Sequence, residues 1–344
     1  MKPILLKYII VFAIVSIATQ ATGQDIHFSQ LFETPFLRNP ALAGLFKGDI
    51  RIQTVYRSQW NQVTDAYRTT SANIEYKLPV GDANDFVTLG GQVLYDKSGT
   101  VNLSSIHVLP AINYHKSLST EKNKYLSLAF MGGYVQKSID QSKISTNNQY
   151  FNSTYNQYSY NGEPLSSGNY GFFDGSVGLS FNSQIGENED NNYYIGVAYH
   201  HFAKPKKLSF YDNVAAELTP KIVGSAGLRM SLTDYSFITF EGDYSKQGPT
   251  VEIIGGLLYT LKLDDIVDPI YLIHGGAYIR ANDAIIPVIK LETTPMSFAV
   301  SYDINISGLK KVSTGRGGFE LSISYKKFLE RDNSTSKSMR CPKF

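Results

Sequence analysis

Residues 173–182, FDGSVGLSFN, alternate between two kinds of side chain. Phe, Gly, Val and Leu occupy the odd positions, and Asp, Ser, Gly and Asn occupy the even ones. Because successive side chains of a β-strand point to opposite faces, this segment has one apolar and one polar face. About ten residues is also the length with which a tilted strand crosses an outer membrane. The stretch therefore predicts one strand of a transmembrane β-barrel.

Thirteen further segments repeat this pattern along the chain. A soluble β-sandwich would alternate as well, but many of these apolar faces end in an aromatic residue, such as Tyr56, Tyr95 and Tyr134, as the aromatic girdles of membrane barrels do. The prediction is an all-β fold, a transmembrane antiparallel β-barrel of about 14 strands with an N-terminal plug or latch segment. The expected strands cover residues 50–57, 72–78, 87–95, 106–115, 126–134, 173–182, 193–199, 222–230, 238–244, 251–259, 271–279, 285–291, 298–306 and 319–325.

Connection lengths predict the orientation of the barrel. With an even strand count both ends of the chain face the periplasm, and the connections after odd-numbered strands face outward. The two long polar connections, about 137–170 and 202–219, both follow odd-numbered strands. Short turns at 79–82, 116–123, 186–192 and 231–234 follow even-numbered strands and are expected in the periplasm.

The first residues predict the compartment. Lys2 and Lys7 precede and flank the apolar run 8–18, and small residues follow up to Gly23, which is the layout of a secretory signal. A membrane anchor helix is the alternative, but the run is short for crossing roughly 30 Å of hydrocarbon. Of 32 basic and 30 acidic residues, cleavage removes two lysines and no acid, so the mature chain carries 30 of each. This balance does not favour a nucleic-acid partner.

These observations predict four parts of the chain. Residues 1–23 form the signal peptide, and residues 24–48 form a plug or periplasmic segment because they lack a strand period. Residues 49–328 form the outer-membrane barrel, and residues 329–344 form a polar periplasmic tail. The tail contains the lone cysteine, Cys341, which excludes an internal disulfide framework.

No motif points to catalysis, a metal or a cofactor. None of the six histidines has a partner at a recognised metal-ligand spacing, and His200 and His201 are expected on opposite faces of a strand, where they cannot share a metal. A lipase or protease site would need those histidines with Ser209 or Asp212. The interpretation is that the chain is not an enzyme and binds no cofactor.

Three clusters of charged residues could have a functional role, but a simpler explanation is favoured for each. Asp264, Asp265 and Asp268 could hold calcium, although a solvated turn is favoured because the residues lack the Asp-x-Asp-x-Asp-Gly spacing. The basic residues at 204, 206 and 207 could contact anionic lipid, although a solvated loop is favoured. The predicted lumen charges Arg51, Arg57, Glu75 and Glu241 could select solutes. The favoured interpretation is that they pair across the lumen and fix the plug.

Several short motifs make the sequence specific. The mature start, residues 24–30 (QDIHFSQ), is followed by NPALAG at 39–44 and by YRSQW at 56–60 in the first strand. The YDKSG turn at 95–99 follows the third strand, and the chain ends in RCPKF at 340–344. In these motifs, and over its length from the signal to the last strand, the sequence resembles the PorP/SprF family, outer-membrane proteins of the type IX secretion system of Bacteroidetes. The residues that carry this resemblance in the plug and first strand are Phe28, Asn39, Pro40, Ala41, Gly44, Tyr56, Arg57, Gln59 and Trp60.

The resemblance implies a role in protein export. The expected partners are outer-membrane lipid, an exported surface adhesin of the gliding type or its C-terminal domain, and periplasmic secretion-ring and peptidoglycan-binding components. Asp96, Gly99, Cys341 and Pro342 are the positions at which partner contact is expected. Because 14 strands enclose too narrow a lumen for a folded adhesin, an anchor is favoured over a conduit. The alternative function is a hatch-type transporter of small or hydrophobic solutes, which needs an apolar lumen pocket and a lateral exit.

Overall fold

The computed structural model describes residues 25–59, 66–81, 84–119, 121–151, 154–156, 159–206, 208–211, 216–266, 268–308 and 315–329. Within these ranges nearly all regular structure is strand, and the helices are single turns. Each strand forms where side chains alternate between lipid-facing apolar and inward-facing polar positions. The strands are β1 (Ile50–Gln59), β2 (Tyr67–Pro79), β3 (Phe86–Ser98), β4 (Leu103–Ser117), β5 (Lys124–Ser138), β6 (Tyr150–Phe151), β7 (Thr154–Tyr155), β8 (Asn169–Gln184), β9 (Asn192–His200), β10 (Lys221–Thr233), β11 (Ser236–Gln247), β12 (Thr250–Lys262), β13 (Tyr271–Arg280), β14 (Ala284–Thr293), β15 (Met296–Asn305) and β16 (Arg316–Lys327).

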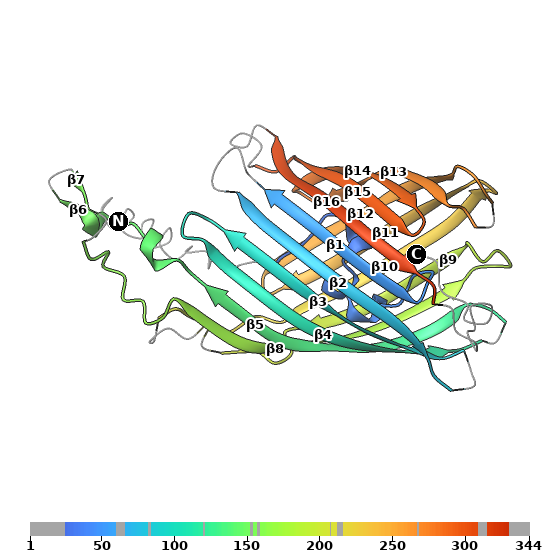
Figure 1. Cartoon of the computed structure of the whole chain (residues 1–344), viewed down its shortest axis with the longest axis horizontal. Helices are drawn as coiled ribbons and strands as arrows, with labels where there is room; N and C mark the ends of the chain where they lie inside the picture. Colours follow the sequence, from blue (N-terminus) through green and yellow to red (C-terminus); the bar gives the residue numbers. More distant parts are fainter. Residues whose placement is uncertain are drawn as a thin grey trace, which may run out of the picture.

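Fourteen of these strands close into one antiparallel barrel, and β6 and β7 form a separate small hairpin. Each barrel strand pairs with its neighbours along the chain, and β1 pairs with β16 to close the ring. Figure 1 shows the long tilted strands of the barrel wall. The predicted all-β barrel of about 14 strands is therefore confirmed, and each predicted strand overlaps one barrel strand.

The outer face of the barrel is an apolar belt. Phe130 and Ile289, for example, are 54% and 66% exposed and point away from the lumen. Most inward-facing positions instead carry polar or charged side chains that are buried, such as Gln53, Asn73 and Ser127. In the described ranges, no helix has the length and the apolar character needed to cross a bilayer.

The two ends of the barrel differ. One end carries the connections 139–168 and 201–220 and is called the long-loop end; the other carries turns such as 234–235 and 294–295 and is called the short-turn end. The longest connection forms an arm, residues 139–168, which contains β6 and β7 and projects beyond the strands (Figure 1). β1 begins and β16 finishes at the short-turn end.

The chain before β1 lies inside the barrel. This inner segment, residues 25–48, contains the one-turn helices η1 (Leu31–Glu33), α2 (Pro35–Arg38) and η2 (Pro40–Leu42). Asp25 contacts residues at the long-loop end, and the backbone N–H of Asp49 donates to Lys327 O at the short-turn end. The inner segment therefore runs the height of the lumen, and Figure 1 shows it in blue between the strands.

Candidate functional site

Buried charges of the barrel wall hold the first turn of the inner segment. The Glu320 carboxylate accepts hydrogen bonds from the backbone N–H groups of Ser29 (2.7 Å) and Gln30 (3.0 Å). Arg57 donates to Glu320, to Asp303 (2.8 Å) and to the Ser29 hydroxyl (2.8 Å). All five side chains are almost fully buried. Each buried charge therefore lies beside an opposite charge or a hydrogen-bond donor. Such a partner offsets the free-energy cost of removing the charge from water.

Neighbouring strands place these charges side by side. Arg57 on β1 lies directly opposite Glu320 on β16 in the strand register, and Glu320 lies opposite Ser301 on β15. Arg280 of β13 reaches Asp303 (3.2 Å) and the Ser29 hydroxyl (2.7 Å). The four charges therefore form one network along the wall from β1 to β13, with the inner segment hydrogen-bonded to it.

A second network holds the middle of the inner segment. The guanidinium of Arg38 donates two hydrogen bonds to Asp243, at 2.7 and 2.8 Å, and one to Glu241 at 3.2 Å. It also donates to the hydroxyl of Tyr194 (2.8 Å), which itself donates to Glu241 (2.9 Å). Paired donation to a carboxylate is among the strongest polar contacts in proteins. Burial lowers the pKa of Arg38, but Asp243, Tyr194 and Glu241 outweigh that effect and raise it.

The NPALAG motif forms a tight turn against the opposite wall. The Asn39 side chain accepts from the N–H of Ala41 and donates to Leu179 O, while Asn113 donates to the carbonyls of Ala41 and Ala43. At Gly44 φ is +91°, and an added Cβ would lie 2.3 Å from the Thr88 hydroxyl. Only glycine fits this backbone and this close approach.

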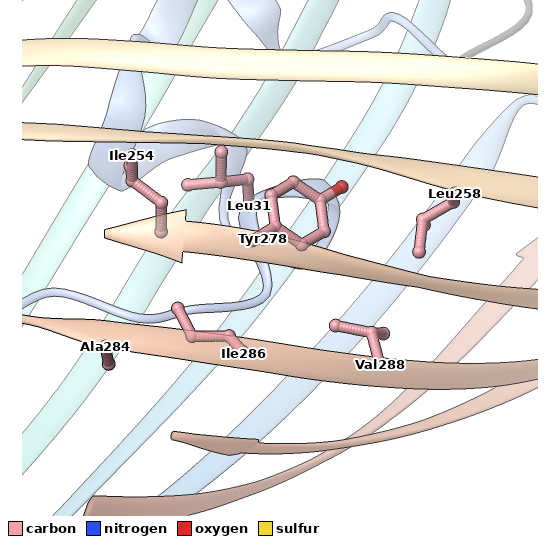
Figure 2. Close-up of a cluster of buried hydrophobic side chains, with 7 residues drawn as sticks. All are labelled: Leu31, Ile254, Leu258, Tyr278, Ala284, Ile286 and Val288. Carbon is pink, nitrogen blue, oxygen red and sulfur yellow. The ribbon is translucent and has the colours of Figure 1, made fainter. Parts of the chain in front are cut away.

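The inner segment also makes an apolar contact with the barrel wall. Leu31 packs against inward-facing side chains of β12, β13 and β14 (Figure 2). The polar inner face that alternation predicts does not extend over this part of β12–β14, where the inward-facing side chains are apolar as well. Leu31 covers the inward apolar patch, which removes it from water. The patch consists of Ile254, Leu258, Tyr278, Ala284, Ile286 and Val288.

The start of the inner segment is held at the long-loop end by a histidine between two carboxylates. His201 Nδ1 lies 2.5 Å from Asp174 Oδ2, and Nε2 lies 2.6 Å from Asp25 Oδ2. Lys221 Nζ lies 3.8 Å from the same Asp25 oxygen. Burial lowers the pKa of His201, but the two carboxylates outweigh it and raise the pKa to about 9. The ring is therefore a cation at neutral pH.

The expectation that His200 and His201 point to opposite faces is wrong. Both side chains are buried, and their ring centres lie 6.3 Å apart. β9 stops at His200, and His201 has a left-handed backbone with φ of +60°, so the alternation of the strand no longer applies to it. His200 contacts the Ser176 hydroxyl (2.9 Å) and Arg38 O (3.2 Å). The Ser209 hydroxyl instead accepts from the N–H of Tyr211, and residue 212 lies outside the described ranges.

The histidine contact gives a pH prediction. An unfolded histidine titrates near 6.5 and His201 near 9, so the stabilisation is complete below pH 6.5 and is lost as the pH rises through 9. Asp25 has a lowered pKa and stays ionised throughout, since its contact with His201 outweighs the opposing effect of burial. At pH 6 we expect the free energy of unfolding of His201→Gln to be roughly 2–3 kcal/mol lower than that of the wild type. Urea unfolding followed by circular dichroism should show the gap shrinking by pH 10; a gap of equal size at both pH values would contradict the assignment.

Two cavities flank the inner segment. A cavity of about 480 Å³ lies towards the short-turn end, where Thr294 and Phe328 are among its lining residues. A second cavity, of about 360 Å³, lies towards the long-loop end and is lined by His27, Gln59 and Asp283 among others. Residues 28–33 and the Arg57 network lie between the two.

The structure brings together most of the residues that carry the family resemblance. Phe28 packs on Val55 and Leu94, and the 39–44 turn and Arg57 belong to the contacts described above. Tyr56 faces outward, and Gln59 lies at the end of β1. Of the expected partner contacts, Asp96 accepts from the Thr69 hydroxyl at the end of β3, and Gly99 starts the turn to β4. Trp60, Cys341, Pro342 and the signal peptide lie outside the described residues.

The lumen charges are paired, but mostly not across the lumen. Arg51 pairs with Glu75 on the adjacent strand β2, and Arg57 with Glu320 on the adjacent strand β16. Facing residues on paired strands are about 5 Å apart, whereas the inner segment fills the space further in. Glu241 pairs with Arg38 of the inner segment. The sequence pattern did not predict roles for Arg38, Ser29 or Asp25, because their partners Asp243, Asp303 and His201 lie 205, 274 and 176 residues away along the chain.

The remaining charged clusters are ordinary turns and loops. The Asp264 carboxylate accepts from the N–H groups of Ile270 and Tyr271, and Lys206 lies 4.0 Å from Glu217. Across the described ranges, no group of three or more His, Cys, Asp or Glu side chains is arranged to hold a metal ion.

Known proteins place the chain in context. No curated protein matches the sequence. Similar solved structures include the CymD monoaromatic hydrocarbon channel, with 11% identity, a TM-score of 0.48, and 90% of this chain and 96% of that chain covered. A Pseudomonas aeruginosa FadL homologue has 9% identity, a TM-score of 0.47 and coverage of 86% and 94%. The translocator domain of the Neisseria meningitidis autotransporter NalP has 12% identity, a TM-score of 0.40 and coverage of 81% and 88%.

A closed β-barrel with an apolar outer belt is the form in which outer-membrane proteins cross their bilayer. The family model for the type IX secretion system membrane protein PorP/SprF matches residues 20–325 of this 344-residue sequence. With nearly the whole barrel inside that match, the chain belongs to the PorP/SprF family and is an outer-membrane barrel of type IX secretion.

Proposed function

We propose that this chain is a non-enzymatic anchor that supports the export or surface attachment of a partner adhesin of the gliding type. The observation that carries the proposal is the filled lumen. The inner segment is bonded to β1, β13, β15 and β16 through Ser29 and Gln30, and to β9 and β11 through Arg38. Because the inner segment is hydrogen-bonded to the barrel wall on several sides, the barrel is better suited to act as an anchor than as a passage for a folded protein.

The arm at the long-loop end supports the outer half of this proposal. Tyr150, Phe151, Tyr155 and Tyr160 are 43–78% exposed on it, and residues 141–170 contain one Lys and one Glu. Exposed tyrosines among Asn and Ser are typical of protein-binding loops, because they offer a large contact area with little loss of side-chain entropy. The N–H of Asp140 donates to Val101 O, so the Gly99 turn adjoins the base of the arm. We propose that Asp96 and Gly99 contribute to the same surface.

The periplasmic half of the proposal concerns the two ends of the chain. We propose that the signal peptide is cleaved near Gly23 and that residues 24–48 act as a plug. Residues 329–344, with Cys341 and Pro342, are proposed to contact periplasmic secretion-ring and peptidoglycan-binding components. The barrel surface itself contacts outer-membrane lipid through its apolar belt.

An affinity pull-down from detergent-solubilised outer membranes, read by mass spectrometry, tests the proposal. We expect one dominant large surface protein, and about fivefold or more loss of it when Tyr150, Phe151 and Tyr160 are all replaced by Ser, since exposed aromatics at an interface often dominate its binding energy. Leu118→Ser, which removes an exposed apolar residue at the opposite end, is the matched control. If the barrel purifies with neither a surface protein nor periplasmic components, the proposal is wrong.

One observation favours a second candidate, a hatch-type transporter of small or hydrophobic solutes. The apolar patch on β12–β14 is the kind of lumen wall that such a solute needs. Leu31 covers this patch, so transport would require the inner segment to move. A deletion strain with unchanged solute uptake would remove this candidate.

A further inference from the structure

The outer face of the barrel carries polar side chains just beyond its aromatic residues at the long-loop end. Tyr56 on β1 and Tyr95 on β3 are 37% and 41% exposed and face outward. Because every second residue of a strand faces the same way, Ser58 and Lys97 face outward too, roughly 6–7 Å further along their strands. Outward-facing aromatic residues mark the edge of the hydrocarbon layer. Ser58 and Lys97 therefore lie at the level of the lipid headgroups.

The strand register places five outward-facing residues of this level side by side. Ser58 lies opposite Arg68 on β2, and Arg68 lies opposite Lys97. Lys97 lies opposite Ser104 on β4, which in turn lies opposite Ser138 on β5. The hydroxyl oxygens of the last two are 2.7 Å apart, so both side chains project from the same face. This headgroup row, residues 58, 68, 97, 104 and 138, holds two cations and three hydroxyls and contains no carboxylate.

Two like charges face each other within the headgroup row. Facing side chains on paired strands have Cβ atoms about 4.5–5.5 Å apart, and like charges in that position are destabilising. Asp96, the neighbour of Lys97 in sequence, points to the other face of the sheet, where its carboxylate accepts from the Thr69 hydroxyl at 2.7 Å. Within the described ranges, neither Arg68 nor Lys97 has an ion-pair partner. An anion bound between them would remove the repulsion.

The side chains of the row match a phosphate group. Arginine and lysine bind phosphate oxygens through charge-assisted hydrogen bonds, and the serine hydroxyls on either side offer further donors. Long basic side chains at the edge of an apolar surface can cover it with their stems while the charged ends remain in the polar layer. A phosphate that is attached to acyl chains would place its charge at the row and its chains on the apolar belt below.

We propose that the headgroup row binds the phosphate of one membrane lipid. The phosphate lies between Arg68 and Lys97, and the flanking serine hydroxyls donate to its oxygens. The acyl chains lie along the outward faces of β2 and β3, where Ile74 and Val93 are 53% and 49% exposed. In the orientation of bacterial barrels the long-loop end faces outward, which places this lipid in the outer leaflet. The site uses neither the arm nor the inner segment, so it goes beyond the proposed function.

Native mass spectrometry of the full-length barrel in detergent tests the proposal. Phosphatidic acid is compared with diacylglycerol, which has the same acyl chains but lacks the phosphate. We expect one phosphatidic acid bound per barrel, about fivefold or more tighter than diacylglycerol. Inorganic phosphate added in equal amount should leave the lipid bound, because it lacks the chains that pack on the belt.

Variants locate the site on the barrel surface. Arg68→Gln and Lys97→Gln should each weaken phosphatidic acid binding about tenfold and leave diacylglycerol unchanged, whereas Lys97→Arg should retain the binding. Lys246→Gln is the matched control. Lys246 is an exposed lysine near the same end of the barrel, on β11, but its strand neighbours are Ile222 and Val251 instead of a second cation.

Thermal unfolding gives a second measurement. Phosphatidic acid should raise the unfolding midpoint of the wild type but not that of Lys97→Gln, because a ligand stabilises the folded state that binds it. Heat-modified migration on a gel shows that each variant is a folded barrel. Equal binding of the two lipids, displacement by equimolar inorganic phosphate, or unchanged affinity in both glutamine variants would overturn the proposal.

Discussion

Replacement of Arg57 by Met is expected to lower the free energy of unfolding by about 3–5 kcal/mol, because it leaves buried carboxylates without their main counter-charge. Glu320 and Asp303 are 0% and 2% exposed, and Arg57 donates to both. Arg280 still reaches Asp303, but Glu320 keeps only the N–H groups of Ser29 and Gln30. Urea unfolding of the purified barrel in micelles, followed by circular dichroism, measures the change.

Two further variants separate charge from packing. Arg57→Met combined with Glu320→Gln should recover part of the loss, since the second change removes one of the stranded charges. Arg68→Met removes an arginine at an exposed end of β2 and should change the unfolding free energy by less than about 0.5 kcal/mol. An Arg57→Met protein as stable as the wild type would show that the network does not hold the barrel and its inner segment together.

Deletion of residues 26–46 is expected to turn a closed barrel into an open pore. Residues 28–33 lie between the two cavities, and removal of the whole stretch exposes the polar inner walls to water from both ends. A lumen of 14 strands without its contents is wide enough for water and small ions, although narrower than that of 16–18-stranded porins. In planar bilayers the full-length protein should give no resolved current steps, whereas the deletion variant should give discrete ones.

The matched control is deletion of arm residues 142–165, which lie outside the lumen and should leave the barrel closed. If the lumen deletion fails to fold, the double variant Arg38→Met, Arg57→Met loosens the inner segment while keeping its mass, and it should give intermittent openings. A folded deletion variant with no conductance would mean that something other than the inner segment closes the barrel.

Much of the fold could be predicted because strand alternation is a local signal. The stretch 173–182 sets its own two faces, and thirteen similar stretches then require a closed barrel, which leaves no unpaired edge in the membrane. The apolar inner wall is an exception. In 284–289 the apolar residues Ile286 and Val288 face inward beside the outward Ile285 and Ile289, so alternation alone could not show that this wall is apolar.

The sequence by itself determined the strands and their number, because the alternation that marks each strand is a local signal. The strand count then placed the two long connections at one end of the barrel. Only the tertiary structure decided that Ser29, Arg38 and Asp25 are held by Glu320, Asp243 and His201, partners that are 176–291 residues away. It also decided that His201 turns towards the lumen, through a left-handed backbone that a strand pattern does not encode. Charges on one face of a barrel have several neighbours within reach, and the position of the inner segment selects among them.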